Sequence, residues 1–130
     1  MHNLNDPQLL KDSSYINGSW HSSANKLAVN NPATGKRIAK VSNAGVEEAE
    51  LAIKSAKNTF KVWSAKSANE RSTLLRNWFD LIIENQDDLG RILTLEQGKP
   101  LAEAKGEIAY GAAFIEWFAE EGKRVYGDTI

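Results

Sequence analysis

The sequence predicts an α+β chain that is mainly α-helical and carries antiparallel β-hairpins at its N-terminal end. Before Val46, short apolar runs alternate with Asn-Gly and Asn-Pro turns, the pattern of short strands joined by tight turns. From Val46 onward, apolar residues recur three or four positions apart, which is the period of amphipathic helices. A chain of 130 residues with 42% apolar residues is long enough for one hydrophobic core but not for two domains.

The N-terminal residues 1–13 are polar except for one leucine pair, and they predict a flexible tail or a short helical turn. Order is expected to begin near Tyr15. Asn17-Gly18 lies between two short apolar pairs and is the strongest short hairpin signal, because both residues tolerate the positive φ of a type I′ turn. With Ser19 it also matches an N-glycosylation acceptor, but no secretory signal precedes it, so we interpret it as a turn.

A second antiparallel pair is expected to follow the first hairpin. Residues 27–30 run into a turn cluster at 31–36, and residues 37–41 then alternate polar and apolar as a half-buried strand does. The next segment has helical periodicity from Val46 and predicts one buried face. The residues on that face are Ala49, Ala52, Ile53, Ala56, Phe60 and Trp63.

A second helix is predicted to start at Ala68. Ser67 and Glu70 have the spacing of a capping box, in which each side chain binds a free backbone N–H at the helix start. The residues it is expected to bury are Leu74, Leu75, Trp78, Leu81 and Ile82. Residues 85–88 then either kink this helix or break it and start a third helix, which ends at Gly98.

The last helix is predicted from Pro100, at its first position, to about Tyr126, with Gly127 as its cap and cations in its last turn. One stripe carries mainly small residues, which allow close packing: Ala104, Ile108, Gly111, Ala112, Ile115, Phe118, Ala119 and Gly122. Aromatic residues lie off this stripe, at Tyr110, Phe114 and Trp117. A helix that is apolar on two sides is normally buried between two layers, which suggests that part of the fold is missing.

The composition excludes several classes of function. The absence of cysteine excludes thiol nucleophiles, disulfides and thiolate metal sites within these 130 residues. Sixteen basic and seventeen acidic residues give a net charge of −1, so we expect neither nucleic acid nor a membrane surface as a partner. No apolar run approaches the length of a membrane span, and no signal peptide is recognised, so we expect a cytoplasmic protein.

No catalytic constellation is visible among the titratable residues. His2 and His21 belong to no nucleophile–base arrangement, and we interpret both as surface groups. The carboxylates of the last helix are interpreted as solvated: Glu120 is expected to pair with Arg124, and Glu103 to complement the helix dipole. The other members of this acidic set are Glu107, Glu116 and Glu121. Gly98-Lys99-Pro100 is not a phosphate loop, because it lacks the upstream glycine and the Ser or Thr after the lysine.

Several motifs together resemble the N-terminal region of the NAD(P)-dependent aldehyde dehydrogenases, in order and at the family's spacing from Tyr15 onward. They are Asn31-Pro32-Ala33-Thr34-Gly35, Phe60-Lys61-Val62-Trp63, the segment from Glu70 to Arg76, and Leu93-Thr94-Leu95-Glu96-Gln97-Gly98-Lys99-Pro100. Residues 96–108 and 114–124 look most like the succinate-semialdehyde dehydrogenase branch.

This resemblance implies an enzyme that oxidises an aldehyde through a cysteine thiohemiacetal, hydride transfer to NAD or NADP, and thioester hydrolysis assisted by a glutamate. It implies that residues 14–130 are the N-terminal, incomplete portion of a Rossmann-like cofactor-binding domain. The family's catalytic, cofactor-loop and oligomerisation segments come later in the chain, so no catalytic, cofactor-binding or metal residue is carried over. We expect no cofactor to bind this chain alone. Its expected partners are the remainder of the aldehyde dehydrogenase fold and further copies of the same protein.

The resemblance also places the last helix near the substrate entrance, where Phe114, Trp117 or Phe118 would line the tunnel, although ordinary core packing explains them as well. Some family members hold a monovalent cation near the turn equivalent to Asn30-Asn31, which we do not expect here. Two interpretations stay open. The chain is an inactive N-terminal part of a semialdehyde dehydrogenase, or a naturally short structural module that docks onto itself or a longer relative.

Overall fold

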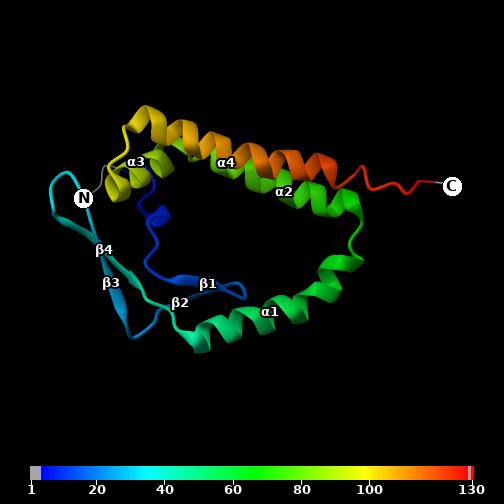
Figure 1. Ribbon diagram of the computed structural model, residues 1–130, viewed down its shortest axis with the longest axis horizontal. Coiled ribbons are helices and arrows are strands. Elements are labelled where there is room, and N and C mark those ends of the chain that lie inside the picture. The colour runs from blue at the N-terminus through cyan, green and yellow to red at the C-terminus, as the bar shows by residue number, and fades with distance from the viewer. Residues whose placement is uncertain (1–3, 129) are drawn as a thin grey trace.

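The computed structural model describes residues 4–128 and residue 130. Figure 1 shows the helices α2 and α4 side by side, α3 at one end of that pair, and α1 lying apart from them. Within the described residues the elements are η1 (Pro7–Leu9), β1 (Ser14–Ile16), β2 (Ser19–His21), β3 (Lys26–Asn30), β4 (Arg37–Ser42), α1 (Val46–Ala65), α2 (Ala68–Glu84), α3 (Gln86–Gln97) and α4 (Leu101–Glu121). The predicted α+β class, with its N-terminal hairpins, is confirmed.

The N-terminal segment contains the short helical turn that was one of its two expected forms. Asp6 caps the 3-10 helix η1 by accepting a hydrogen bond from the Gln8 N–H at 2.9 Å. The backbone N–H groups of Asn5 and Asp6 in turn donate to the carboxylate of Asp88 in α3. The segment therefore has a defined place on the fold, while the mobility expected of it stays a prediction.

The first hairpin forms as its Asn-Gly pair predicts. Strands β1 and β2 pair antiparallel, with Tyr15 opposite Trp20, and the two rings lie 5.1 Å apart. Asn17 has φ 52° and Gly18 has φ 79°, the two positive values that a type I′ turn requires. The local sequence alone therefore determined this turn.

The second hairpin pairs β3 with β4, in a separate two-stranded sheet. In the connecting turn the Asn31 side-chain oxygen accepts hydrogen bonds from the N–H groups of Ala33 at 2.9 Å and Thr34 at 3.2 Å. This is an Asx turn, in which a side chain replaces a backbone acceptor. The Asn-Pro turn prediction is confirmed, and the Asn31 side-chain oxygen is committed to the backbone of that turn.

Helix α1 begins where predicted, but its expected buried face is wrong. None of its residues is buried, and Ile53 and Phe60 are 68% and 65% exposed. The physical reason is that α1 contacts little of the described chain beyond the edge of β1, and stands away from α2 and α4 (Figure 1). The apolar face exists, but no described element covers it.

The capping box at the start of α2 is confirmed. The Ser67 hydroxyl accepts the Glu70 N–H at 3.2 Å, and the Glu70 carboxylate accepts the Ser67 N–H at 2.8 Å. Of the two possibilities for residues 85–88, the structure shows a break. Asn85 ends α2 and begins α3, with φ −100° and ψ 14°.

The corner between α3 and α4 is built on Gly98. Its φ of +82° closes α3, and its N–H donates to the Thr94 carbonyl at 2.9 Å. Pro100 was expected at the first helical position but is the N-cap, because its ψ of 138° is extended. Its carbonyl accepts the first helical N–H, from Ala104, at 2.9 Å.

The predicted end of the last helix is also wrong, since α4 stops at Glu121 rather than near Tyr126. After Gly122, the N–H groups of Lys123 and Arg124 donate to carbonyls only three residues back. These tighter bonds end the helix, and glycine has low helix propensity, so Gly122 and not Gly127 is the cap.

The core of the described residues lies between α2 and α4 and is built from small side chains. Ala104, Ala112 and Ala119 are 0%, 1% and 1% exposed, which confirms the packing role of these alanines. The stripe is wrong for Phe118, which is 61% exposed and lies on the aromatic side of α4. On α2 the expected burial is wrong for three residues: Leu74, Trp78 and Leu81 are 48%, 55% and 57% exposed. No described element covers these three side chains.

The total surface area supports the same conclusion. The chain exposes 9653 Å². A compact monomer of its 14.4 kDa mass is expected to expose about 6,800 Å². The surplus is as large as an obligate interface, and much of it is apolar. This surplus fits the suggestion that part of the fold is missing from these 130 residues, which stays a prediction.

Candidate functional site

The strongest candidate site is the aromatic face of α4, which we define as Tyr110, Phe114, Trp117 and Phe118. These residues are exposed, and with Ala113 they surround an apolar hollow of about 330 Å³. Their spacing of three and four residues puts them on one side of the helix. The structure thus brings together the three residues proposed for the tunnel, Phe114, Trp117 and Phe118, and adds Tyr110.

The alanine stripe explains why this face points outward. Because Ala104, Ala112 and Ala119 are buried where α4 meets α2 and α3, the larger side chains are left on the open side of α4. Two of those rings pack against each other: Tyr110 and Phe114 meet edge to face, with centroids 5.0 Å apart and an interplanar angle of 84°. A preformed apolar surface of this kind binds apolar atoms of a ligand or of another protein layer.

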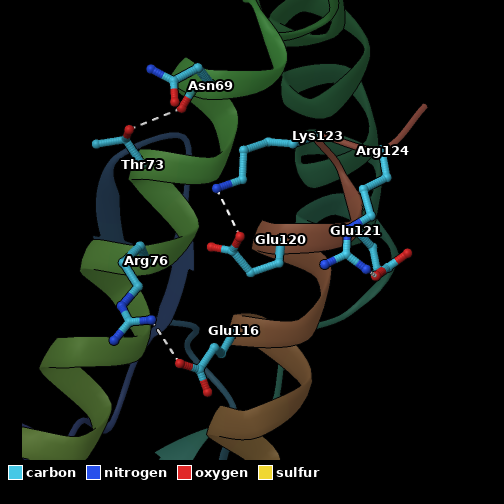
Figure 2. A network of polar contacts seen from close by, with 8 residues as sticks. All are labelled: Asn69, Thr73, Arg76, Glu116, Glu120, Glu121, Lys123 and Arg124. Atoms are coloured by element: carbon cyan, nitrogen blue, oxygen red, sulfur yellow. Dashed lines mark hydrogen bonds and ion pairs between the residues drawn. The ribbon is translucent and has the colours of Figure 1, made fainter. Parts of the chain in front are cut away.

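A polar rim lies beside Trp117, toward the end of α4. Figure 2 shows its side chains, which come from α2, from α4 and from the residues just after α4. The residues of this polar rim are Arg76, Glu116, Glu120, Glu121, Lys123 and Arg124, and most of them line a second hollow, of about 420 Å³, beside Trp117. Arg76 links the two helices, donating to Glu116 at 2.7 Å. It also contacts Asp80, one turn along α2, at 3.3 Å.

The expected ion pair between Glu120 and Arg124 does not form, because each residue pairs with a different partner. Glu120 pairs with Lys123 at 2.9 Å, and Arg124 pairs with Glu121 at 2.8 Å. The spacing of four residues brings side chains together only on a helix, and α4 ends before Arg124. Both carboxylates are nevertheless in ion pairs whose side chains remain partly exposed, as the interpretation of solvated groups expects.

The electrostatics of the polar rim do not favour acid–base catalysis. The hydrogen bond from the Lys123 ammonium lowers the pKa of Glu120. A general acid at neutral pH needs a carboxyl pKa raised toward 7, the opposite direction. Glu116 is engaged by the Arg76 guanidinium, and Glu107 is paired with Lys99. These groups therefore serve to hold α2, α4 and the corner together.

The remaining sequence candidates have structural surroundings. His21 Nε2 lies 3.2 Å from the Ile16 carbonyl oxygen, across the hairpin, and His2 lies outside the described residues. Residues 4–128 and 130 hold no cluster of three or more His, Cys, Asp or Glu side chains suited to a metal ion. In the same residues, no helix combines the length and apolarity of a membrane span. That no residue here is catalytic or cofactor-binding stays a prediction.

Sequence reasoning missed two features of this region. Arg76 is part of the polar rim because α2 and α4 lie side by side, and nothing in its local sequence indicates a partner 40 residues away. Tyr110 was noted as lying off the small-residue stripe, and its spacing of four from Phe114 was the available signal that the two rings form one face.

Comparison with known proteins identifies the family. The model described as "Aldehyde dehydrogenase family" matches residues 20–130. The chain is 55% identical to "Succinate-semialdehyde dehydrogenase [NADP(+)] GabD" of Escherichia coli K12, over 98% of this chain and 27% of that protein. It is 57% identical to a glutarate-semialdehyde dehydrogenase of Pseudomonas putida, with the same coverage.

A solved structure agrees with this result. The succinate-semialdehyde dehydrogenase of Burkholderia pseudomallei superposes with a TM-score of 0.95 at 53% identity, over 98% of this chain and 27% of that one. The chain thus spans 27% of the length of these relatives. Its strands and helices are a segment of their fold, and the chain belongs to the aldehyde dehydrogenase family.

Proposed function

We propose that this chain is the N-terminal part of the cofactor-binding domain of an NAD(P)-dependent aldehyde dehydrogenase that oxidises succinate semialdehyde to succinate. The observation that carries the proposal is the identity of 55% to the E. coli succinate-semialdehyde dehydrogenase across nearly the whole chain. The similarity to a glutarate-semialdehyde dehydrogenase supports a semialdehyde that also carries a carboxylate.

The 130 residues alone are inactive in this proposal. The family's chemistry starts when a cysteine thiolate adds to the aldehyde, and this chain has no cysteine. Hydride then passes to the nicotinamide, and water releases the acid from the thioester. Residues outside the chain supply the nucleophile, the base and the dinucleotide site, so neither NAD nor NADP binds this part alone.

The surplus surface fits this assignment. In the complete enzyme, the remainder of the fold covers the open faces of α1 and α2. The aromatic face of α4 lines the entrance for the aldehyde, with Trp117 and Phe118 in contact with the substrate chain. The hollow of about 330 Å³ beside these rings has the apolar character that such an entrance needs. The complete enzyme is a cytoplasmic homo-oligomer.

The experiment starts from the source DNA beyond the codon for Ile130. An open frame is expected to encode a cysteine nucleophile and cofactor loops. Expression of that frame should give formation of reduced nicotinamide with succinate semialdehyde, faster than with glutarate semialdehyde, and the 130-residue chain should give none. A stop codon directly after Ile130 would overturn the proposal in favour of a short structural module. Activity of the 130-residue chain by itself would refute its dependence on later segments.

A further inference from the structure

The tip of the first hairpin carries a chemical feature that the proposed function does not use. Asn17-Gly18 is the only Asn-Gly pair in the 130 residues. Both residues are exposed, at the turn between β1 and β2. A Cβ built on Gly18 would meet nothing closer than the Tyr15 hydroxyl, at 4.0 Å. Gly18 itself carries no side chain to hinder the approach of its backbone nitrogen to the Asn17 side chain.

We propose that Asn17 is a modification site, at which the side-chain amide is lost by spontaneous deamidation. Hydroxide removes the Gly18 N–H proton, and the nitrogen attacks Cγ of Asn17. The N–Cγ bond forms, the Cγ–Nδ2 bond breaks, and ammonia leaves from a five-membered succinimide. Water then opens the ring at either carbonyl, which gives aspartate or isoaspartate. The only co-reactant is water, and nothing is oxidised or reduced.

The hairpin around this site is weak enough for the reaction to proceed in the folded protein. Ring closure requires the turn to relax from its paired form, so the rate depends on the cost of opening. Each strand has only three residues, and the two form a sheet by themselves. Isolated two-stranded hairpins are marginally stable in water, and such segments open at low free energy.

The modification changes how the hairpin meets α1. The Ser55 hydroxyl in α1 donates to the Asn17 side-chain oxygen at 3.1 Å. Isoaspartate would extend the main chain by one methylene at a position with φ 52°, and so remove the type I′ geometry. We expect the hydrogen bond to Ser55 to be lost and the pairing of Tyr15 with Trp20 to loosen. Conversion of Asn17 to isoaspartate would therefore detach the hairpin from α1 as the protein ages.

The test follows the amide of Asn17 by peptide mapping and mass spectrometry. Purified protein, whose folded state is verified by circular dichroism, is incubated at mildly alkaline pH beside a sample unfolded in urea. Asn58 is the internal control, because it is exposed on α1 and is followed by β-branched Thr59. Asn17 is expected to convert at a rate within about tenfold of the unfolded sample, which corresponds to an opening cost of about 1.4 kcal/mol.

Two variants complete the test. Asn17→Gln should remove the isoaspartate that an isoaspartyl methyltransferase labels, because ring closure through the longer side chain is slow. Ser55→Ala keeps the Asn-Gly pair and should keep the label. The proposal is overturned if folded Asn17 converts as slowly as Asn58 while the unfolded sample reacts. It is equally overturned if the label persists in Asn17→Gln. None of these outcomes depends on dehydrogenase activity.

Discussion

The carboxylate of Asp88 accepts a hydrogen bond from the backbone N–H of Asp6 at 2.7 Å, joining residues 82 positions apart. The other carboxylate oxygen accepts the Asn5 N–H at 3.0 Å and the Asn5 side-chain amide at 3.2 Å. Asp88 is only 3% exposed. A single side chain on α3 therefore satisfies the donors that position the N-terminal segment.

This attachment should depend on pH. The backbone hydrogen bonds from Asp6 and then Asn5 lower the pKa of Asp88 below its ordinary value of 3.8, with a smaller contribution from Arg91. Because the folded-state pKa is the lower one, the stabilisation is complete above the unfolded-state pKa. It is lost as the pH falls through the folded-state pKa. Hydrogen exchange of the Asn5 and Asp6 amides, measured from neutral to acid pH, should show protection that disappears at the acid end.

The variant Asp88→Asn isolates the charge, because it keeps the shape and one acceptor oxygen. It should expose the two amides to exchange at neutral pH and remove the pH dependence of their protection. Asp87→Asn is the matched control, since Asp87 pairs with Lys105 on the exposed side of α3. Equal protection of the Asn5 and Asp6 amides in wild type and Asp88→Asn across the pH range would show that the carboxylate does not hold the segment.

The packing of α4 on α2 predicts a second, position-specific effect. Ala112 is 1% exposed, whereas its neighbour Ala113 is exposed on the aromatic side. Ala112→Leu inserts three carbons into the closed seam and should reduce the free energy of unfolding by about 1–3 kcal/mol. Ala113→Leu should change it by no more than about 0.5 kcal/mol. Urea unfolding followed by circular dichroism compares the two, and equal effects would mean that the seam is not packed as described.

The corner glycine, Gly98, gives a third prediction. Replacing it by alanine should lower the stability, whereas the same change at the control position, Gly106, should raise it. Gly98 has φ +82°, and a Cβ there would lie 2.8 Å from Cγ of Pro32 in the β3–β4 turn. Gly98→Ala should therefore destabilise by at least about 1–2 kcal/mol, the cost of a left-handed non-glycine residue. Gly106 lies inside α4 with nothing within 4 Å of its Cβ position. Gly106→Ala should stabilise by about 0.5–1 kcal/mol, and thermal unfolding of both variants tests the contrast.

The features that the sequence predicted well are those encoded by residues close together in the chain. Asn17-Gly18 specifies its turn through backbone freedom, and Ser67 with Glu70 satisfies the first N–H groups of α2 within one helical turn. The burial errors arose where the partner is distant or absent, whereas the position of Pro100 and the end of α4 were local errors, decided by the backbone geometry at Pro100 and Gly122. The Asp88 contact depends on a segment 82 residues earlier, which no local pattern reveals.

The errors about burial have one physical cause. The apolar residues of α1 and the outer side of α2 were assigned to a core on periodicity, and Phe60 and Trp78 are in fact exposed. Periodicity shows that a helix has an apolar face but not which chain segment covers it. Among the described residues no layer covers those faces, and the chain spans about a quarter of the length of its relatives. Helical spacing likewise predicted a second apolar side on α4. It could not tell whether that side contacts a ligand or another part of the protein.

The last prediction concerns the aromatic face in the complete enzyme. If Trp117 lines the aldehyde entrance, Trp117→Leu should raise the KM for succinate semialdehyde several-fold, while kcat changes little. In that position the indole would contact the substrate chain in both ground and transition states, so its loss would weaken uniform binding. Phe114→Leu and Phe118→Leu should act in the same direction. Trp20→Leu, in the first hairpin, is the control and should leave KM unchanged, although Trp20 is comparably exposed, at 51% against 62% for Trp117. An unchanged KM in all three α4 variants would instead assign these rings to packing against the rest of the fold.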